Sequence, residues 1–439
     1  MRKQLAQKPR TSCWKSSREA HRKNPLWRRN LLLVSAQKAV CKVSAGDDLL
    51  VKLSQSVAIP DNLDRLELLL NDYLASLIDG TKVKQRALAQ DGSIGFGAYL
   101  SMLASSNDRD DVDWSLGAHF GAIVWSTIFP LCMKDPSLRT NAIQAAYSGY
   151  QAGNSIGNFL GVSHRMKWHV TSTAGAVASA SAASVMLGLN ESQHQNSLRL
   201  AITNMAGSSK APREREGAAS FNRAAATTLG LVSAMSDARS IDELWEESRG
   251  VLELYSATGG DAIVSDGVAT ASIRPFATNG FSQSAVLATS RLSARSQGEL
   301  KSIEVHIAQG IAPILDGSRG GSWWTIKSCV ASAWASKDPT HLLPASEIEK
   351  LVSVIPSDVP IGAAKIVVHT SSGSDSEEQL KPPGVALELP QEQAWAHSKW
   401  NSMAGPRAEE ISQLAKDFVQ GRPNEKLWKL FEEIAKSAQ

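Results

Sequence analysis

The stretch GVSHRMKWHVTSTAGAVASASAASVMLGL, residues 161–189, decides the fold of this chain. It opens with His164 and His169, continues with small hydroxyl residues over 171–173, and ends in a long run of Ala, Ser and Val. Side chains this small let a helix lie deep in a protein with its backbone close to its neighbours. A histidine and hydroxyls at the start of such a helix lie at its partly positive end, which suits an anionic or polar ligand. We therefore predict that this stretch forms the floor of a pocket, with His169 as its main chemical group.

The composition indicates an ordinary soluble globular protein with a large core. The chain has 439 residues, of which 43% are hydrophobic and 20% charged, a length that usually makes about two domains. No apolar run approaches the roughly 20 residues that span a bilayer, so we expect no membrane partner. Four cysteines without CxxC or metal-ligand spacing indicate a reducing compartment.

The charge is distributed unevenly between the N-terminal segment and the remainder. Residues 1–45 carry twelve Lys or Arg and one acid, Glu19, whereas the remainder carries 34 basic residues against 42 acidic ones. An Arg-rich, Ser-containing and almost acid-free start is typical of a mitochondrial presequence. A nucleic-acid-binding arm, a disordered tail or a mispredicted coding sequence remain alternatives, and the acidic body favours no nucleic-acid partner. We expect a cytoplasmic or mitochondrial protein.

The residues up to 267 carry helical patterns and hardly any strand signal. The clearest is 61–80, where leucines recur at helical spacing between Asp61 and Gly80. Residues 218–237 form a second helix of small residues. The remaining predicted helices cover 47–59, 92–105, 118–132, 137–160, 191–206 and 241–254.

The second part of the chain predicts a mixture of strands and helices. Residues 302–308 and 364–369 alternate or cluster β-branched residues as strands do. Helices are expected over 322–335 and 344–354, and a polar loop over 371–383. The chain turns helical again from Pro406, with a closing amphipathic helix over 428–435. The predicted fold class is therefore mainly α, with a large helical domain over 46–267, a smaller α+β domain over 268–394 and a helical return over 395–439.

The common motif searches leave only histidines and acids as candidates. The chain has no phosphate-binding loop, dinucleotide fingerprint, HExxH or nucleophile elbow. Asp111 and Asp113 could hold a magnesium ion, but a solvated acidic loop is favoured. His164 and His169 do not share a helical face, so we predict no metal site. A hydrogen-bonded core position is the simpler interpretation for His169 or His119 taken alone. His194 and His397 are expected on the surface.

Several segments in register resemble one family. KWHVTSTAG, residues 167–175, followed by the Ala-rich run, is similar to the G-[FW]-H-P-T-G-T-x-G segment of the MmgE/PrpD family. This family contains 2-methylcitrate dehydratase and cis-aconitate decarboxylase. The resemblance covers about 47–435. The other similar segments are the 63–80 helix, DVDWS at 111–115 with His119, Gly149-Tyr150, NRAAA at 222–226, IRPF at 273–276 and the strand at 300–308.

The resemblance implies a fold and a reaction class. It implies a helical domain that carries the active site, an α+β lid domain, a homodimer and no cofactor. Relatives act on small di- or tricarboxylates by dehydration or decarboxylation. A base removes a proton beside a carboxylate, or carbon dioxide leaves, and an acid protonates the leaving hydroxyl or the carbanion. Cationic side chains hold the carboxylates.

The family's active-site residues carry over only in part. His169 and His119 match two active-site histidines, and Asp111 or Asp113 with Ser115 matches the acidic-hydroxyl loop. A lysine before the 222–226 segment falls on Gly217, where Lys210, Arg213 or Arg215 could replace it. The other departures are a lid lysine that falls on Arg274, two lid histidines that fall on Asn279 and Gln283, and a tyrosine that falls on Ser328.

These departures lead to three hypotheses. A pocket short of cations binds a tricarboxylate poorly, and nearby tryptophans favour bulky or flat ligands. The first hypothesis is therefore an enzyme of lyase ancestry acting on a bulkier, less charged secondary-metabolite intermediate, by elimination, isomerisation or shape-driven cyclisation. The second is a conventional polycarboxylate lyase, and the third an inactive member that serves as a binding partner. The predicted catalytic residues are His169, His119, Asp113 and Asp111, and the predicted substrate-binding residues are Ser115, Trp114, Trp168, Thr171, Thr173, Arg274, Asn279, Ser328 and Arg213.

Overall fold

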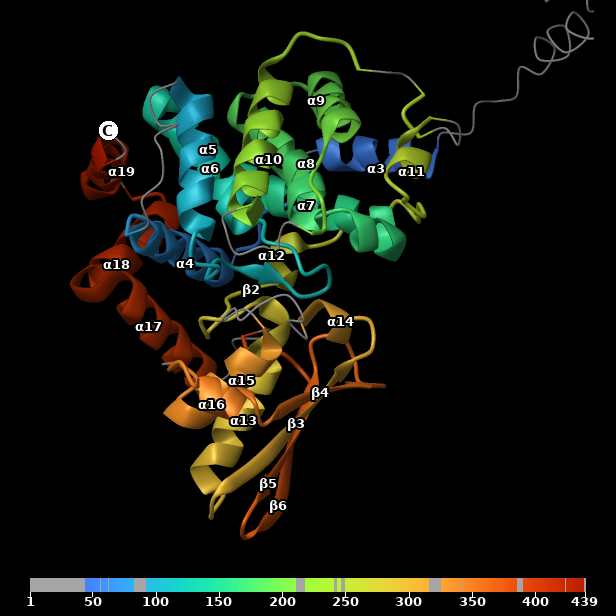
Figure 1. Ribbon diagram of the computed structural model, residues 1–439. Helices are drawn as coiled ribbons and strands as arrows, with labels where there is room; N and C mark the ends of the chain where they lie inside the picture. Colours follow the sequence, from blue (N-terminus) through green and yellow to red (C-terminus); the bar gives the residue numbers. More distant parts are fainter. Residues whose placement is uncertain are drawn as a thin grey trace, which may run out of the picture. The chain divides into compact units, whose positions relative to one another are not determined.

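The leucine pattern at 61–80 forms helix α4, Asp64–Gly80, in the computed structural model of the chain (Figure 1). Leu66, Leu70 and Leu74 lie on its buried face, and each such burial contributes about 1.5–3 kcal/mol. The structure describes residues 44–55, 57–61, 63–82, 92–210, 218–240, 243–245, 249–315, 325–340, 342–384, 390–422 and 424–437.

Helix α8, Val170–Met186, is the buried small-residue helix predicted from the central stretch. It packs between α7, Ala142–Lys167, and α10, Ala218–Met235. A Cβ added at Gly230 of α10 would lie 2.2 Å from the Cβ of Ser179, so neither helix tolerates a larger residue there. The hydroxyls of Ser179 and Thr127 bond to each other at 2.7 Å, which satisfies polar groups inside the core.

Most other predicted helices of the first part are confirmed within a few residues. One prediction is wrong, because the described part of 241–254 is helical only over α11, Val251–Leu254. Arg249 has a left-handed backbone, with φ at 64°, and Gly250 is extended, which interrupts a helix. The remaining helices are α3 (Ala45–Ser54), α5 (Gly92–Ser105), α6 (Gly121–Lys134), α9 (Glu191–Asn204) and α12 (Gly267–Thr270).

A four-stranded sheet forms the α+β part. Its strands lie in the order β4 (Val352–Ser357), β3 (Leu300–Ala308), β5 (Ala364–Thr370) and β6 (Gly373–Gln379). Buried residues alternate along β3, Leu300–Ala308, and pack with α13, Gln283–Arg295, and α15, Ile326–Ser336, into one core cluster (Figure 1). The central strand β3 pairs antiparallel with β5, Ala364–Thr370. Both predicted strands are thus confirmed. Two short helices, α14 (Ala312–Leu315) and α16 (Ser346–Glu349), also belong to this part.

Two predictions in this part are wrong, and both concern edge strands. The predicted helix over 344–354 is the short α16 followed by β4, Val352–Ser357, which runs parallel to β3. Pro356 is tolerated in β4 because an edge strand does not need every N–H. The predicted loop over 371–383 contains β6, Gly373–Gln379, whose polar residues pair with β5 through the backbone. Alternation of apolar residues is not required at a solvated edge, so residues 373–379 carry no alternating pattern that would predict a strand.

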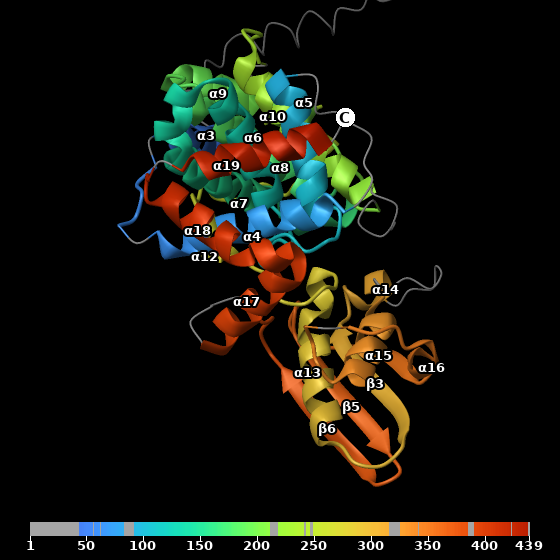
Figure 2. The same cartoon turned by 90° about the vertical axis from the view of Figure 1, so that its left-hand side faces the viewer.

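The C-terminal helices pack against the helical part, as Figure 2 shows for α18, Ala408–Val419, and α19, Glu425–Ser437. The ring of Phe431 of α19 packs at a tilt of 32° against that of Phe129 of α6, with ring centroids 4.4 Å apart. A buried ion pair between Lys399 of α17, Pro390–Ala404, and Asp72 joins the return to α4. The fold is mainly α with a smaller α+β part, as predicted. Residues from 45 onward form one compact unit, and the predicted division into domains stays a prediction.

Candidate active site

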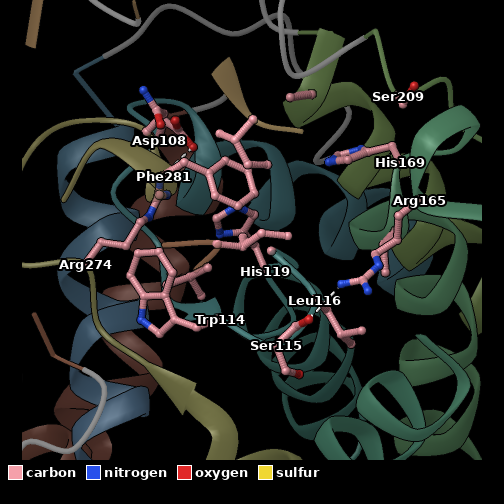
Figure 3. A pocket seen from close by; sticks show the side chains of 18 of the residues that line it. Asp108, Trp114, Ser115, Leu116, His119, Arg165, His169, Ser209, Arg274 and Phe281 are labelled. Atoms are coloured by element: carbon pink, nitrogen blue, oxygen red, sulfur yellow. Dashed lines mark hydrogen bonds and ion pairs between the residues drawn. The ribbon is translucent and has the colours of Figure 1, made fainter. Parts of the chain in front are cut away.

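A cavity of about 590 Å³ lies beneath the α5–α6 loop, in the size range of small-molecule sites. Its wall comes from that loop, the ends of α5 and α7, the start of α8 and α10, and three segments of the α+β part. Figure 3 shows His169 and Arg165 on one side of it, Trp114 and Arg274 on the other, and His119 between them. The lining residues used below are Asp108, Trp114, Leu116, His119, Val162, Arg165, Met166, Trp168, His169, Arg223, Arg274, Phe281 and Ile361.

The loop between α5 and α6 is held by Asp113, which is buried. Its carboxylate accepts hydrogen bonds from the Ser115 N–H at 2.9 Å and the Ser115 hydroxyl at 2.6 Å, which closes a tight turn. Its other oxygen accepts from Thr270 at 2.7 Å. The short strand β1, Val112–Asp113, pairs with β2, Ala271–Ser272. Asp113 therefore fixes the loop that carries Trp114 and His119.

His119 lines the cavity, and its Nε2 makes no hydrogen bond to a described residue. Its Nδ1 lies 2.6 Å from the carbonyl oxygen of Asp111, so Nδ1 carries the proton and donates it. The neutral ring then has its lone pair on Nε2. Burial lowers the pKa of His119 to about 4, and Arg274 and Arg223 act in the same direction against Asp110. At neutral pH His119 is an acceptor.

His169 presents the opposite form of the ring. It lies at the N-cap of α8, and its Nδ1 is 3.3 Å from the amide nitrogen of Asn222. Because that amide donates, Nδ1 accepts and the ring proton resides on Nε2. Burial lowers the pKa of His169 well below its ordinary value, and Arg223 and His119 lower it further. His169 is thus a neutral donor in the same cavity.

Two buried arginines share two buried or half-buried aspartates at the cavity floor. Arg274 donates to the Asp110 carboxylate at 2.6 Å and to the Asp110 carbonyl at 2.8 Å, and its Nη1 is 2.9 Å from Asp108. Arg223 is held more loosely, with Nε 3.4 Å from Asp110 and Nη2 3.8 Å from Asp108. Although burial raises the pKa of Asp108, the neighbouring cations lower it to about 2. The floor therefore holds two positive and two negative groups.

A kink in α7 brings a third cation to the wall. Gly161 has φ at 79°, and a Cβ there would lie 2.3 Å from Thr258 Oγ1, so glycine is required. Beyond the kink, Arg165 donates to the Ser115 carbonyl at 2.7 Å, and Asp113 is the carboxylate that stabilises its charge.

Apolar side chains form the rest of the wall. Trp168 stacks on His164 with an interplanar angle of 12°, and the Phe281 ring lies 3.0 Å from the Cβ position of Gly117. Val162, Met166 and Ile361 also line the cavity and are 61%, 58% and 62% exposed, so they mark its mouth. The mouth is apolar and the floor is charged.

The structure places the predicted site residues in three groups. His119, His169, Trp114, Ser115, Trp168, Arg274 and Asn279 line the cavity. Asp111, Asp113, Thr171, Thr173 and Ser328 do not line it. Arg213 lies outside the described residues, as do the predicted replacement Arg215 and Gly217.

The residues that do not line the cavity support those that do. Thr171 Oγ1 accepts from the His119 N–H at 3.2 Å, and Thr173 bonds to His164 at 2.8 Å. Asp111 accepts from the Gly121 N–H at 3.0 Å and from Tyr150 at 3.1 Å. Burial, then the charge of Asp110, raises the pKa of Asp111 to about 8. Ser328 lies in the first turn of α15, where its N–H bonds to Thr325.

Two surface interpretations are wrong. The acidic loop is not solvated, because Asp110, Asp111 and Asp113 are buried and bonded to arginine, tyrosine and backbone groups. His194 is also buried, with Nε2 3.0 Å from the Ser181 hydroxyl. Among the described residues, no group of three His, Cys, Asp or Glu side chains could hold a metal ion.

Sequence reasoning missed Arg223, Arg165, Asp108 and Asp110. Arg223 stood in the NRAAA segment, and its inward position follows from the helical period, since Ala226, Thr227 and Gly230 on the same face are also buried. Asp110 carries no such signal. Its partner Arg274 lies 164 residues further along the chain.

Comparison with known proteins identifies the helical part. Residues 96–262 match the family model of the MmgE/PrpD N-terminal domain, and they include both cavity histidines and Arg223. A search of curated proteins gave no match. No helix among the described residues is long and apolar enough to cross a membrane. The match over residues 96–262 supports membership of the MmgE/PrpD family.

Proposed function

We propose that this chain is a lyase- or isomerase-type enzyme that moves a proton beside the carboxylate of a bulky, weakly charged acid, with His119 as the base and His169 as the acid. The family match supports a dehydratase- or lyase-like protein.

The observation that carries the proposal is the pair of neutral histidines with opposite tautomers in one cavity. The lone pair of His119 Nε2 can accept a proton, and the N–H of His169 Nε2 can donate one. General acid–base catalysis needs both partners within reach of the reacting atoms, and it contributes about 10²- to 10⁴-fold.

In an elimination, two proton transfers accompany the formation of a C=C bond and the breaking of a C–O bond. His119 Nε2 takes the proton from the carbon beside the carboxylate, and the electron pair of that C–H bond forms the C=C bond. The C–O bond at the next carbon breaks, and the leaving hydroxyl takes the proton of His169 Nε2 and departs as water. The two rings then exchange their protons with solvent. Isomerisation uses the same first transfer, followed by protonation of a different carbon.

The charges around the cavity support a substrate with little charge. Arg223 and Arg274 are matched by Asp108 and Asp110, and Arg165 interacts with Asp113. Both cavity histidines have lowered pKa values and add no positive charge at neutral pH. A trianion would leave most of its charge without a counter-ion, which is very costly in a buried site.

The experiment is proton exchange in heavy water. The full chain is incubated in D₂O with hydroxy acids and unsaturated acids that carry apolar groups, and mass spectrometry follows deuterium at the carbon beside the carboxylate. The proposal expects uptake with at least one acid, reduced about 100-fold or more in His119→Ala and in His169→Ala. Uptake at the wild-type rate in either variant contradicts it.

A second function, a polycarboxylate lyase, is favoured by one observation. Among the described residues, three arginines line the cavity, of which only Arg274 was predicted to bind substrate. This function expects turnover of 2-methylcitrate or cis-aconitate, followed by loss of substrate absorbance or by carbon dioxide release. No product from either acid contradicts it.

A further inference from the structure

The two floor arginines differ in how fully their donors are used. The Arg274 guanidinium bonds through all three nitrogens, to Asp110, Asp108 and the Thr278 carbonyl. It therefore has little capacity left for a ligand. Its observed role is to fix the two aspartates.

Arg223, in contrast, makes no hydrogen bond to any described residue through its side chain. Its Nε is buried and without a hydrogen-bond partner, as is the facing Oδ2 of Asp110. The side chain is only 3% exposed and lines the cavity. A buried guanidinium with unused donors is costly unless a ligand satisfies it. A planar carboxylate fits the guanidinium fork with two parallel hydrogen bonds.

The remaining wall fits an apolar body. Trp114, Phe281 and Leu116 come from the α5–α6 loop and the α+β part, and Trp168 from the end of α7. Val162, Met166 and Ile361 continue this surface outward to the mouth. Aromatic and aliphatic walls of this kind gain affinity with each methylene that they bury.

We propose that the cavity binds an amphipathic monocarboxylic acid, with its carboxylate on Arg223 and its apolar body between Trp114, Phe281 and Trp168. This inference rests on the function proposed above, since it names the substrate class of the same site. One carboxylate is the number that the hydrogen-bond donors of one guanidinium fork can hold. A longer apolar body would extend past Val162 and Ile361.

The same contact links binding to the acid–base pair. Arg223 is one of the groups that lower the pKa of both His119 and His169. A carboxylate on Arg223 offsets that positive charge, so it raises the pKa of both rings and makes His119 a stronger base. The substrate would thus strengthen the base that acts on it.

Calorimetric titration of the full chain with unreactive probes tests this inference. The probes are octanoate, butanoate, octanol and tricarballylate, a trianion without a hydroxyl. Octanoate is expected to bind at least about tenfold more tightly than each of the other three, since only it has both the single carboxylate and the apolar length. Equal or tighter binding of tricarballylate overturns the inference.

Variants locate the carboxylate. Arg223→Met is expected to weaken octanoate binding about tenfold or more and to leave octanol binding unchanged. Arg291→Met is the matched control, because this arginine is exposed on α13 and pairs with Glu377 away from the cavity. If Arg223→Met does not fold, Arg223→Lys serves instead, with an intermediate loss expected because lysine lacks the fork. Octanoate binding at the wild-type affinity in the folded Arg223 variant overturns the inference.

The two proposals fail in different ways. Absence of octanoate binding, together with histidine-dependent deuterium uptake by other acids, overturns only the substrate class. Arg223-dependent octanoate binding, with deuterium uptake that ignores both histidines, supports the substrate class and contradicts the acid–base function.

Discussion

His164 and His169 lie only five residues apart, yet they belong to different regions of the molecule. In the core, His164 uses both ring nitrogens, because Nδ1 donates to the Tyr255 carbonyl at 2.9 Å and Nε2 accepts from Thr173 at 2.8 Å. In the cavity, His169 uses Nδ1 for Asn222 and keeps the N–H of Nε2 available. Both are buried, so burial does not separate the core histidine from the site histidine. What separates His164 from His169 is the number of ring nitrogens that already have a hydrogen-bond partner.

The largest expected effect is on the activity of variants at the two cavity histidines. His119→Ala and His169→Ala should each lower kcat/KM by about 10²- to 10⁴-fold, because each removes one partner of the proton transfer. The melting temperature should change little by comparison. His397→Ala, an exposed histidine on α17, is the control and should leave the rate unchanged. Turnover of the substrate by His169→Ala at the wild-type rate would show that His169 is not the catalytic acid.

For His164, the histidine in the core, we predict a loss of stability and not of activity. His164→Ala should lower the free energy of unfolding by about 2–4 kcal/mol, because it opens a cavity, leaves the Tyr255 carbonyl without its donor and removes one of the two hydrogen bonds of the Thr173 hydroxyl. Urea unfolding measures the change. The kcat of the folded variant should stay within about threefold of the wild type. A stable but inactive variant would show that His164 belongs to the site.

A third buried histidine, His194, should make the stability of the fold depend on pH. Burial lowers the pKa of His194 to about 4, below its unfolded value of about 6.5. Since the unfolded chain takes up this proton first, stability falls as the pH falls from 6.5 toward 4, by at most about 1.4 kcal/mol per pH unit from this group. Unfolding measured across this window should show a shallower fall in His194→Asn, with kcat unchanged. An unaltered slope would mean that His194 is not neutral in the fold.

The smallest effect concerns the amide that sets the tautomer of His169. Asn222→Leu should lower kcat by about five- to tenfold, the value of one neutral hydrogen bond, because Nδ1 loses its donor and the ring can adopt either form. Steady-state kinetics measure this, and circular dichroism checks the fold. A loss as large as that of His169→Ala would instead show that Asn222 contacts the substrate.

Local patterns predicted the helical architecture but not the polar contacts between distant segments. The leucines of α4 and the small residues of α8 carry their burial in their spacing and size. Strand β6 was not predicted, because apolar and polar residues need not alternate along a solvated edge strand. The acidic loop was wrongly predicted to be solvated, because an aspartate without a partner nearby in the sequence is usually exposed. Its buried partner Arg274 lies far along the chain.

The resemblance located His119 and His169, and it could not say which other groups reach the cavity. Arg223 lies in a segment that the resemblance already included, but only the fold shows that its donors are unused. Trp168 is positioned by the stack on His164, which lies four residues earlier in the segment beyond the Gly161 kink.

The tautomers of the two cavity histidines test the account most directly, and they need no substrate. Long-range nitrogen–proton NMR of the full chain with labelled histidine, assigned with His119→Gln and His169→Gln, reports which ring nitrogen carries the proton. At pH 7 we predict two neutral rings, with the proton on Nδ1 of His119 and on Nε2 of His169. A doubly protonated ring, or the same tautomer at both positions, would contradict the proposed division into base and acid.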